Sequence, residues 1–253
     1  MLEISPLEFR FEINSGKIFQ NSFTIKNTGE KPISVKLSSE PAKTTNPTYS
    51  HLAEWVTLSA EKVNLESNET KEISFSVNIP EVLPAGGQYA NIIATINPDD
   101  TSQGIEIYSR IGIRLYASSN IDIDKNVSIS PPQTSSFVLS GPIFATSVVE
   151  NHGNIDFNAK SDFIVSSLLG KELYSNTVIT SVLPSNTKEF YQEWHNKPFF
   201  GIYQMSYTID ALDTHLSLNR LIFAFSSASL CILILIVSAL IGTIVYRYKK
   251  LHR

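Results

Sequence analysis

Few side chains in this sequence have the types and spacing that catalysis or metal binding requires. The five histidines, at positions 51, 152, 195, 215 and 252, form no His-Glu-x-x-His motif, and the single cysteine is Cys231. Glu193 and His195 stand two residues apart and could act as an acid–base pair. Neighbours of this kind in a loop are usually solvated. We therefore expect no catalytic residue, no metal ligand and no cofactor, and predict that the protein is not an enzyme.

Two acidic pairs offer oxygen atoms of the kind that calcium prefers. Asp99 and Asp100 are adjacent, and Asp122 and Asp124 would share one face of a strand. Acidic turns are common in an acidic chain, and here the formal charge is −4 even with four basic residues at the C-terminus. We expect these aspartates to be solvated. An acidic exterior also argues against nucleic acid as a partner.

The elements that would position such residues are mainly strands. Apolar and polar residues alternate over residues 7–13, 73–79 and 105–115, which is typical of strands with one buried face. Turn residues separate the strands at short intervals, and no amphipathic helix is evident between them. We predict an all-β fold in which residues 1–118 form an immunoglobulin-like β-sandwich.

Three short motifs occur twice in the same order, which indicates a duplicated domain. They are Asn-x-Gly, Ser-Asn followed by Thr-Lys-Glu, and Gly-x-Tyr. The first copies begin at Asn27, Ser67 and Gly87, and the second copies at Asn151, Ser185 and Gly201. The second set predicts another immunoglobulin-like sandwich over residues 119–215, so that two sandwiches stand in tandem.

Each repeated motif has a structural interpretation. Asn-x-Gly supplies residues that tolerate positive φ, as tight hairpins need. The Thr-Lys-Glu motif begins with a polar turn that leads into a strand. Gly-x-Tyr resembles a tyrosine corner, in which the hydroxyl of Tyr89 or Tyr203 would bond to the preceding loop. Trp55 is expected in the core, and Trp194 either in the core or on a binding face.

The C-terminal part predicts a membrane span, because no charged residue occurs between Leu221 and Tyr246. A helix over these residues would be about 39 Å long, and the hydrocarbon core of a bilayer is about 30 Å thick. We assign a transmembrane helix to residues 218–246 and a basic cytoplasmic tail to residues 247–253. The basic residues after the span would place the tail in the cytoplasm and both sandwiches outside the cell.

Two alternatives remain open at the N-terminus. Export requires a signal, and MLEISPLEFRF has neither a basic region nor an apolar core. Either a signal peptide was removed from the sequence, or the protein is tail-anchored with its domains in the cytosol. The sandwiches contain no cysteine. Because extracellular eukaryotic domains of this type usually carry a disulfide, a bacterial surface protein is favoured.

Several segments resemble known immunoglobulin-like families. The first domain resembles those of the pilus-chaperone and major-sperm-protein type through Pro6–Phe9, Asn27–Gly29, Trp55–Leu58, Leu65–Thr70 and Gly87–Tyr89. The whole chain is similar in architecture to the WxL-interacting proteins of Gram-positive cell surfaces, with Gly170–Ser175, Leu183–Asn186 and Trp194–Tyr203 in the second domain. That resemblance implies a surface scaffold that binds cell-wall polymer and other surface proteins.

Together these features predict a membrane-anchored cell-surface protein for binding or adhesion. The two sandwiches would meet a surface protein or peptidoglycan, and the C-terminal helix would contact membrane lipid. A long strand such as residues 105–115 would let a partner add a strand at a sheet edge. One alternative is a cytosolic, tail-anchored tether of the major-sperm-protein type, and another is a chaperone-like subunit of surface-fibre assembly.

Overall fold

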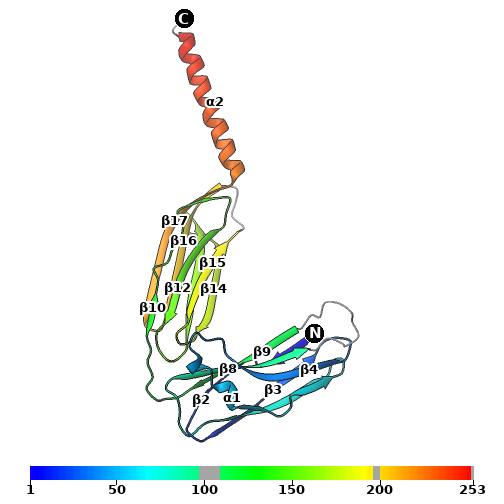
Figure 1. Ribbon diagram of the computed structural model, residues 1–253. Coiled ribbons are helices and arrows are strands. Elements are labelled where there is room, and N and C mark those ends of the chain that lie inside the picture. Colours follow the sequence, from blue (N-terminus) through cyan, green and yellow to red (C-terminus); the bar gives the residue numbers. More distant parts are fainter. Residues whose placement is uncertain (97–108, 196–199, 252–253) are drawn as a thin grey trace. The chain divides into compact units, whose positions relative to one another are not determined.

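A computed structural model describes residues 1–96, 109–195 and 200–251, except for the side chains of residues 200, 227–230, 233 and 246–251. The chain forms two compact units of strands (Figure 1). The first contains residues 1–126, 151–156 and 183–186, and the second contains residues 127–150, 157–182 and 187–253. Each unit contains a β-sandwich with its own hydrophobic core.

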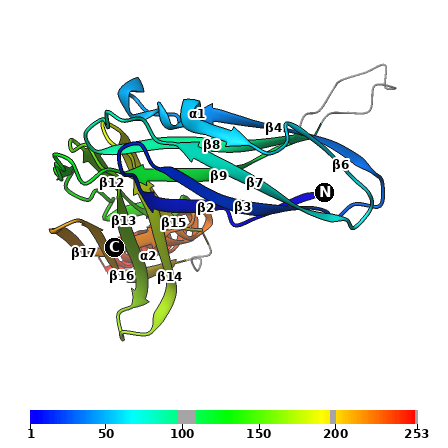
Figure 2. The same ribbon diagram turned by 90° about the horizontal axis from the view of Figure 1, so that it is seen from below.

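The first sandwich has two sheets, in the orders β1-β3-β7-β5 and β2-β9-β8-β4-β6. Its strands are β1 (Leu2–Ser5), β2 (Glu8–Glu12), β3 (Ile18–Asn27), β4 (Ile33–Pro41), β5 (Val56–Leu58), β6 (Lys62–Leu65), β7 (Thr70–Asn78), β8 (Gly87–Ile96) and β9 (Ser109–Ser118). A 3-10 turn (η1, Pro47–Tyr49) and a short helix (α1, Leu52–Trp55) precede β5. Figure 2 shows β3, β7, β8 and β9 running alongside one another.

Alternation along the strands decides which residues of the first sandwich lie inside. In β7, Ile73, Phe75 and Val77 are buried, whereas Ser74 is exposed. The buried residues of both sheets form one core, in which Ile25 and Val35 are completely buried. Burying a side chain of this size contributes roughly 2 kcal/mol, so the core residues hold the two sheets together.

The N-terminal segment crosses from one sheet to the other. β1 pairs antiparallel with the last residues of β3, and β2 pairs parallel with Arg114–Ser118 of β9. Each of these short strands covers only part of its longer neighbour. The first half of β9 is therefore left at the edge of its sheet.

The second sandwich has sheets in the orders β10-β12-β15 and β11-β17-β16-β13-β14. Its strands are β10 (Val127–Ile129), β11 (Phe137–Leu139), β12 (Ile143–Asn151), β13 (Phe157–Ser167), β14 (Glu172–Val182), β15 (Thr187–Trp194), β16 (Phe200–Ala211) and β17 (Thr214–Phe225). This arrangement repeats the first sandwich strand for strand, including a short parallel strand, β11, beside β17. The exception is β5, which has no counterpart among the described residues of the second sandwich.

The repeated turn before β7 and β15 fixes how the two copies align. Glu69 donates its N–H to Glu66 O, and Asn186 donates to Leu183 O, both at 3.1 Å. The residue before each donor has positive φ, at 61° for Asn68 and 58° for Ser185. Asn68 is therefore the structural counterpart of Ser185. Matching the two Ser-Asn motifs by sequence would instead align Ser67 with Ser185, which is shifted by one residue. The following Thr-Lys-Glu segments correspond directly.

The prediction of positive φ angles at the Asn-x-Gly motifs is wrong. Neither Gly29 nor Gly153 has a positive φ. Glycine is needed at both places for space, because a Cβ on Gly29 would lie 2.8 Å from the Met1 nitrogen and a Cβ on Gly153 would lie 2.4 Å from Asp124 O. Contacts this short do not occur with real side chains, so close packing and not backbone conformation selects glycine.

The predicted transmembrane helix over residues 218–246 is also wrong. β17 extends to Phe225, and Ile222 and Ala224 lie completely buried in the core of the second sandwich. The helix α2 (Ser227–Leu251) begins only after this strand. Among the residues that the structure describes, no helix combines the length and hydropathy needed to cross a bilayer. The membrane-lipid partner and the single-pass location in a cell membrane, which depended on that helix, are corrected with it.

Candidate binding surfaces

The first half of β9 lies at an edge of the five-stranded sheet in the first sandwich. β8 pairs with the whole of β9, but β2 pairs with β9 only from Arg114 onward. In the described part of the chain, no strand pairs with Ser109–Ile113 on that side. We call these residues the β9 edge. The predicted partner-binding strand, residues 105–115, is described from residue 109, and residues 105–108 lie outside the described residues.

Backbone groups of Arg110 and Gly112 face away from β8 at this edge. Arg114 donates its N–H to Leu7 O at 3.0 Å, on the side of β2. Because backbone groups alternate between the two sides of a strand, the N–H and C=O groups of Arg110 and Gly112 point to the same side as those of Arg114. An extended segment placed there would continue the line of β2 and bond to these groups.

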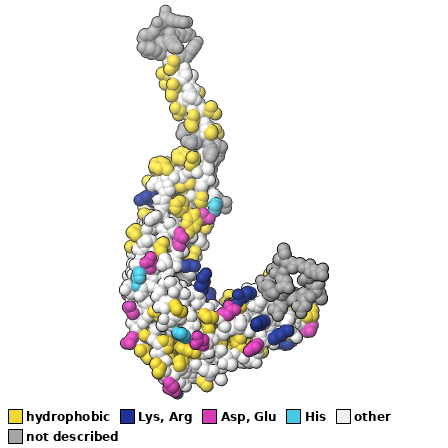
Figure 3. Space-filling view, viewed as in Figure 1, with side chains coloured by type: hydrophobic (Ala, Val, Ile, Leu, Met, Phe, Trp, Pro, Cys, Tyr) yellow, Lys and Arg dark blue, Asp and Glu magenta, His cyan; other side chains and the backbone are white. Residues whose placement is uncertain are grey.

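The two faces beside the β9 edge differ in character. On the outer face, Arg110 bonds to Glu40, and Arg114 lies 3.7 Å from Glu8. On the inner face, Ile113 is completely buried in the core. Figure 3 shows basic and acidic side chains close together on the visible face of the first sandwich. An added segment would match both faces if charged and apolar residues alternated along it.

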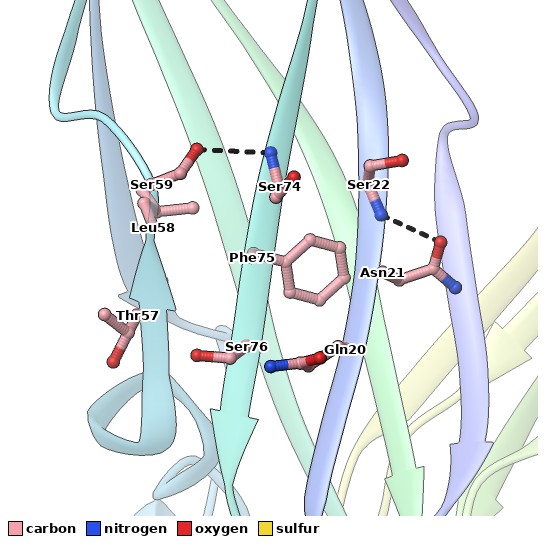
Figure 4. A pocket seen from close by; sticks show the side chains of 9 residues that line it. All are labelled: Gln20, Asn21, Ser22, Thr57, Leu58, Ser59, Ser74, Phe75 and Ser76. Atoms are coloured by element: carbon pink, nitrogen blue, oxygen red, sulfur yellow. Dashed lines mark hydrogen bonds between the residues drawn. The ribbon is translucent and has the colours of Figure 1, made fainter.

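A shallow hollow of about 480 Å³ lies on the other sheet of the first sandwich. β3, β7 and β5 line it with small polar side chains, among them Gln20, Ser22, Ser74 and Ser76 (Figure 4). Phe75 borders the hollow, but its side chain is only 3% exposed and belongs to the core. Sites for small molecules are usually enclosed and largely apolar. The hollow has neither property, so we assign no small-molecule ligand to it.

The Gly-x-Tyr motifs do not form the expected tyrosine corners. The Tyr89 hydroxyl donates to Asp156 Oδ1 at 3.1 Å and accepts the Asp156 N–H at 2.8 Å, and burial raises the pKa of Tyr89. The buried Tyr203 hydroxyl has no hydrogen-bond partner among the described residues. Each ring instead folds back over the glycine two positions earlier, where a Cβ on Gly87 or Gly201 would overlap the tyrosine.

Both tryptophans contact a core. Trp194 is 7% exposed, stacks on Tyr174 with 6.3 Å between ring centroids, and meets Tyr203 edge to face at 5.5 Å. Trp55, at the end of α1, packs against the core of the first sandwich. Neither side chain is therefore available as a fully exposed anchor for a ligand.

Glu193 and His195 do come together, with Oε1 and Nε2 2.8 Å apart. The hydrogen bond with His195, and then the bond from the Tyr191 hydroxyl, lower the pKa of Glu193. A carboxyl that acts as a general acid near neutral pH needs a raised pKa, so Glu193 does not suit the role of the acid. No group of three or more His, Cys, Asp or Glu side chains in the described residues could hold a metal ion. Asp99 and Asp100 lie outside those residues.

Comparisons with known proteins find similar folds but no sequence relative. No family model matches the chain, and no curated protein is significantly similar to it in sequence. The Escherichia coli chaperone DraB is 10% identical, over 87% of this chain and 96% of that chain, with a TM-score of 0.46. A chain from the complex of Salmonella enterica SafA pilin with the SafB chaperone is 12% identical, over 86% and 95%, with a TM-score of 0.46. The PapD-like domain of human CEP192 is 17% identical, over 47% and 84%, with a TM-score of 0.37.

At these identities the similarity concerns the immunoglobulin-like fold alone. The resemblance to domains of the pilus-chaperone type is found again among the solved structures. The resemblance to WxL-interacting proteins has no support in these comparisons. The similarity does not extend to what the chain binds.

Proposed function

We propose that the protein is a binding subunit that holds an extended segment of a partner protein against the β9 edge by strand addition. The observation that carries the proposal is the half-covered β9, where pairing with β2 stops at Arg114. In such complexes main-chain hydrogen bonds supply affinity, and alternate side chains supply selectivity. Because a strand edge holds a partner and performs no chemistry, we propose a binding role and not catalysis.

At two other edges of this sandwich, in β3 and β6, side chains bond to outward-facing backbone groups. The β9 edge differs from them in this respect. Open edges invite unwanted pairing, and proteins usually blunt them. In β3, the side chain of Asn21 accepts the N–H of Ser22 at 2.8 Å, and in β6 the backbone oxygen of Asn64 accepts from Lys71 Nζ at 2.7 Å. The described residues show no comparable side-chain bond to the backbone of Gly112. Among the described residues, the β9 edge therefore lacks a kind of protection that two other edges have, which is consistent with its use in binding.

We propose a surface protein as the partner, in particular a subunit of a surface fibre that the protein would handle as a chaperone does. Among the similar structures are chaperones in complex with a pilin or with a tip adhesin. These complexes suggest the class of partner, whereas the proposal depends on the geometry of β9. The partner segment should carry acidic residues toward Arg110, where they would compete with Glu40, and apolar residues toward Ile113.

The test uses the full chain and a short fluorescein-labelled peptide in which valine and glutamate alternate. Binding is followed by fluorescence anisotropy. Gly112→Pro removes an N–H that faces the edge without removing a bond to β8. Its Cβ would lie 2.8 Å from Ile93 Cδ1, so the Ile93 side chain has to shift as well. We expect Gly112→Pro to weaken binding about tenfold, which corresponds to about 1.4 kcal/mol.

The matched control is Lys62→Pro in β6, at the far edge of the same sheet. The Leu37 N–H donates to Glu61 O at 2.7 Å, so the N–H of Lys62 points outward, away from β4. This variant should bind like the unmodified chain. Arg110→Glu should also weaken binding, and it decides the matter if Gly112→Pro does not fold by circular dichroism. Unchanged affinity in both β9 variants, or no binding by the unmodified chain, would contradict the proposal.

A further inference from the structure

The first sandwich has a strand, β5, at a place where the described residues of the second sandwich have no paired strand. In the first sandwich, β5 pairs with Phe75–Val77 of β7, and the Ser59 N–H donates to Ser74 O at 2.9 Å. The counterpart of β7 is β15, and in the described structure only β12 pairs with β15. The alignment of the repeated turns makes Tyr191 the counterpart of Ser74. The open side of β15 therefore corresponds to the place of β5.

The backbone of Tyr191 faces this open side. Thr146 lies opposite Tyr191 in the register of β12 and β15. Both backbone groups of Thr146 bond instead to Gln133, at 2.8 and 3.0 Å. Because hydrogen-bonded and non-hydrogen-bonded pairs alternate in an antiparallel ladder, the N–H and C=O groups of Glu189, Tyr191 and Glu193 point away from β12.

Aromatic rings lie beside these backbone groups on the outer face of the sheet. Phe144 and Tyr191 stack with their ring centroids 5.8 Å apart and an interplanar angle of 25°. Tyr191 is 48% exposed, although the side chains on either side of it in β15 are buried. The counterparts in the first sandwich are Gln20 and Ser74, which line the hollow of Figure 4. The two copies therefore present different chemistry at the same place in the fold.

Carboxylates flank the rings and are held in position. Glu193 accepts a hydrogen bond from the Tyr191 hydroxyl at 2.7 Å, and Glu189 accepts one from Thr146 Oγ1 at 3.0 Å. The outward positions of β12 and β15 include these glutamates and Glu150, and no lysine or arginine. Any segment added beside β15 would therefore meet carboxylates and aromatic rings on this face, with His195 beside Glu193 and the exposed Lys188 near the start of the strand.

We infer that β15 binds an extended, basic segment of a partner protein, in which arginine or lysine alternates with apolar residues. The segment occupies the place that β5 takes in the first sandwich and bonds to the backbone of Tyr191. Its outward arginines pair with Glu189 and Glu193 and stack over the aromatic rings. Guanidinium groups suit both contacts, because they bind carboxylates in a bidentate manner and lie flat on aromatic faces. An acidic segment would meet like charges, which disfavours it strongly.

This site goes beyond the proposed function and is independent of the β9 edge, since it lies on the other sandwich and selects the opposite charge. The two sites can therefore be tested separately on the same chain. The probe for β15 is a fluorescein-labelled peptide in which arginine and valine alternate. The unmodified chain should bind it at moderate ionic strength, with anisotropy as the readout.

Three changes probe the contacts. Tyr191→Ser introduces the residue that the first sandwich has at this place, and the double variant Glu189→Gln with Glu193→Gln removes both charges. We expect each to weaken binding about tenfold, the effect of losing about 1.4 kcal/mol. A peptide of the same sequence with N-methylated amides keeps its charge but cannot donate main-chain hydrogen bonds, and it should not bind.

Glu172→Gln removes an exposed carboxylate from β14 of the same sandwich and is the matched control, with unchanged affinity expected. Gly112→Pro should not alter binding of the basic peptide, so a failure at β9 can be told apart from a failure at β15. The inference is overturned if Tyr191→Ser and the double glutamine variant bind the basic peptide as well as the unmodified chain does. Equal binding of the N-methylated peptide would overturn it as well, since the attraction would then be charge without strand addition.

Discussion

Asn27 and Asn151 place a carboxamide inside a loop, where each polar atom needs a partner. Asn27 Oδ1 accepts the Gly29 N–H at 2.9 Å, and its Nδ2 donates to Lys31 O at 2.8 Å and to Glu66 O at 3.0 Å. Asn151 repeats the first contact with the Gly153 N–H at 2.9 Å. Since both asparagines are almost completely buried, water cannot replace these bonds.

Asn27→Ala should therefore destabilise the chain. It leaves a buried backbone N–H and buried carbonyl oxygens without their partner, and the expected loss is roughly 2 kcal/mol in the free energy of unfolding. Urea denaturation followed by tryptophan fluorescence measures it. Asn64→Ala, at an exposed position of β6, is the control and should change stability by less than about 0.5 kcal/mol. Equal effects of the two substitutions would show that the buried carboxamide contributes little.

At the level of elements, the same turn launches a strand in both sandwiches. The turns end with Glu69 and Asn186, whose carbonyl groups accept the N–H groups of Asn27 and Asn151, in each case at 3.0 Å. This bond ties the turn to the preceding long strand, so β7 and β15 start in the same register relative to β3 and β12. The geometry that the two turns share explains why the Thr-Lys-Glu motif recurs. It does not require a shared ligand.

Ser185→Gly tests the conformation of the second turn. Ser185 has a φ of 58°, in the left-handed region that costs most residues roughly 1 kcal/mol and glycine almost nothing. We expect Ser185→Gly to raise the free energy of unfolding by about 0.5 to 1 kcal/mol, measured by thermal or urea denaturation. Asn68→Gly should gain less, because asparagine tolerates this region better than serine does. A loss of stability in Ser185→Gly would argue against strain at this turn.

At the level of the whole molecule, each sandwich buries tyrosines whose hydroxyls ionise less readily than they do in water. The side chain of Tyr207 is completely buried, and its hydroxyl donates to Phe190 O at 3.1 Å. Burial raises the pKa of Tyr207 to about 12. Burial also raises the pKa of Tyr89 and of Tyr203. The neutral hydroxyls are therefore part of the folded state in both sandwiches.

Alkaline pH should unfold the chain for this reason. In the unfolded chain tyrosine ionises near pH 10, so the unfolded state loses its proton first and stability falls as the pH rises. For Tyr207 the loss begins at about pH 10 and continues to its folded-state pKa of about 12. The decrease in Tm across this window should be smaller in Tyr207→Phe than in the unmodified chain. Phenylalanine removes the ionisable group and keeps the ring, and an equal decrease in both proteins would exclude Tyr207 as a cause.

Local patterns were sufficient to predict much of the architecture. Strict alternation, as in Ile73, Phe75 and Val77, depends only on the two-residue period of a strand, and it correctly placed these residues in a core. The repeated motifs predicted two sandwiches, and the matching strand orders are consistent with that duplication. Local patterns failed over residues 221–225, where they predicted part of a transmembrane helix. An uncharged run of residues is compatible both with lipid and with the core of a sandwich.

Tertiary structure alone decided which strands have neighbours. Whether β2 stops at Arg114, and whether a strand such as β5 lies beside β15, depends on pairings between residues far apart in the sequence. Side-chain period in a strand reveals its two faces but says nothing about its two edges, because the backbone groups that form the edges are the same for every residue. For this reason the sequence determined the cores of this protein, and only the folded chain revealed the edges where a partner can bind.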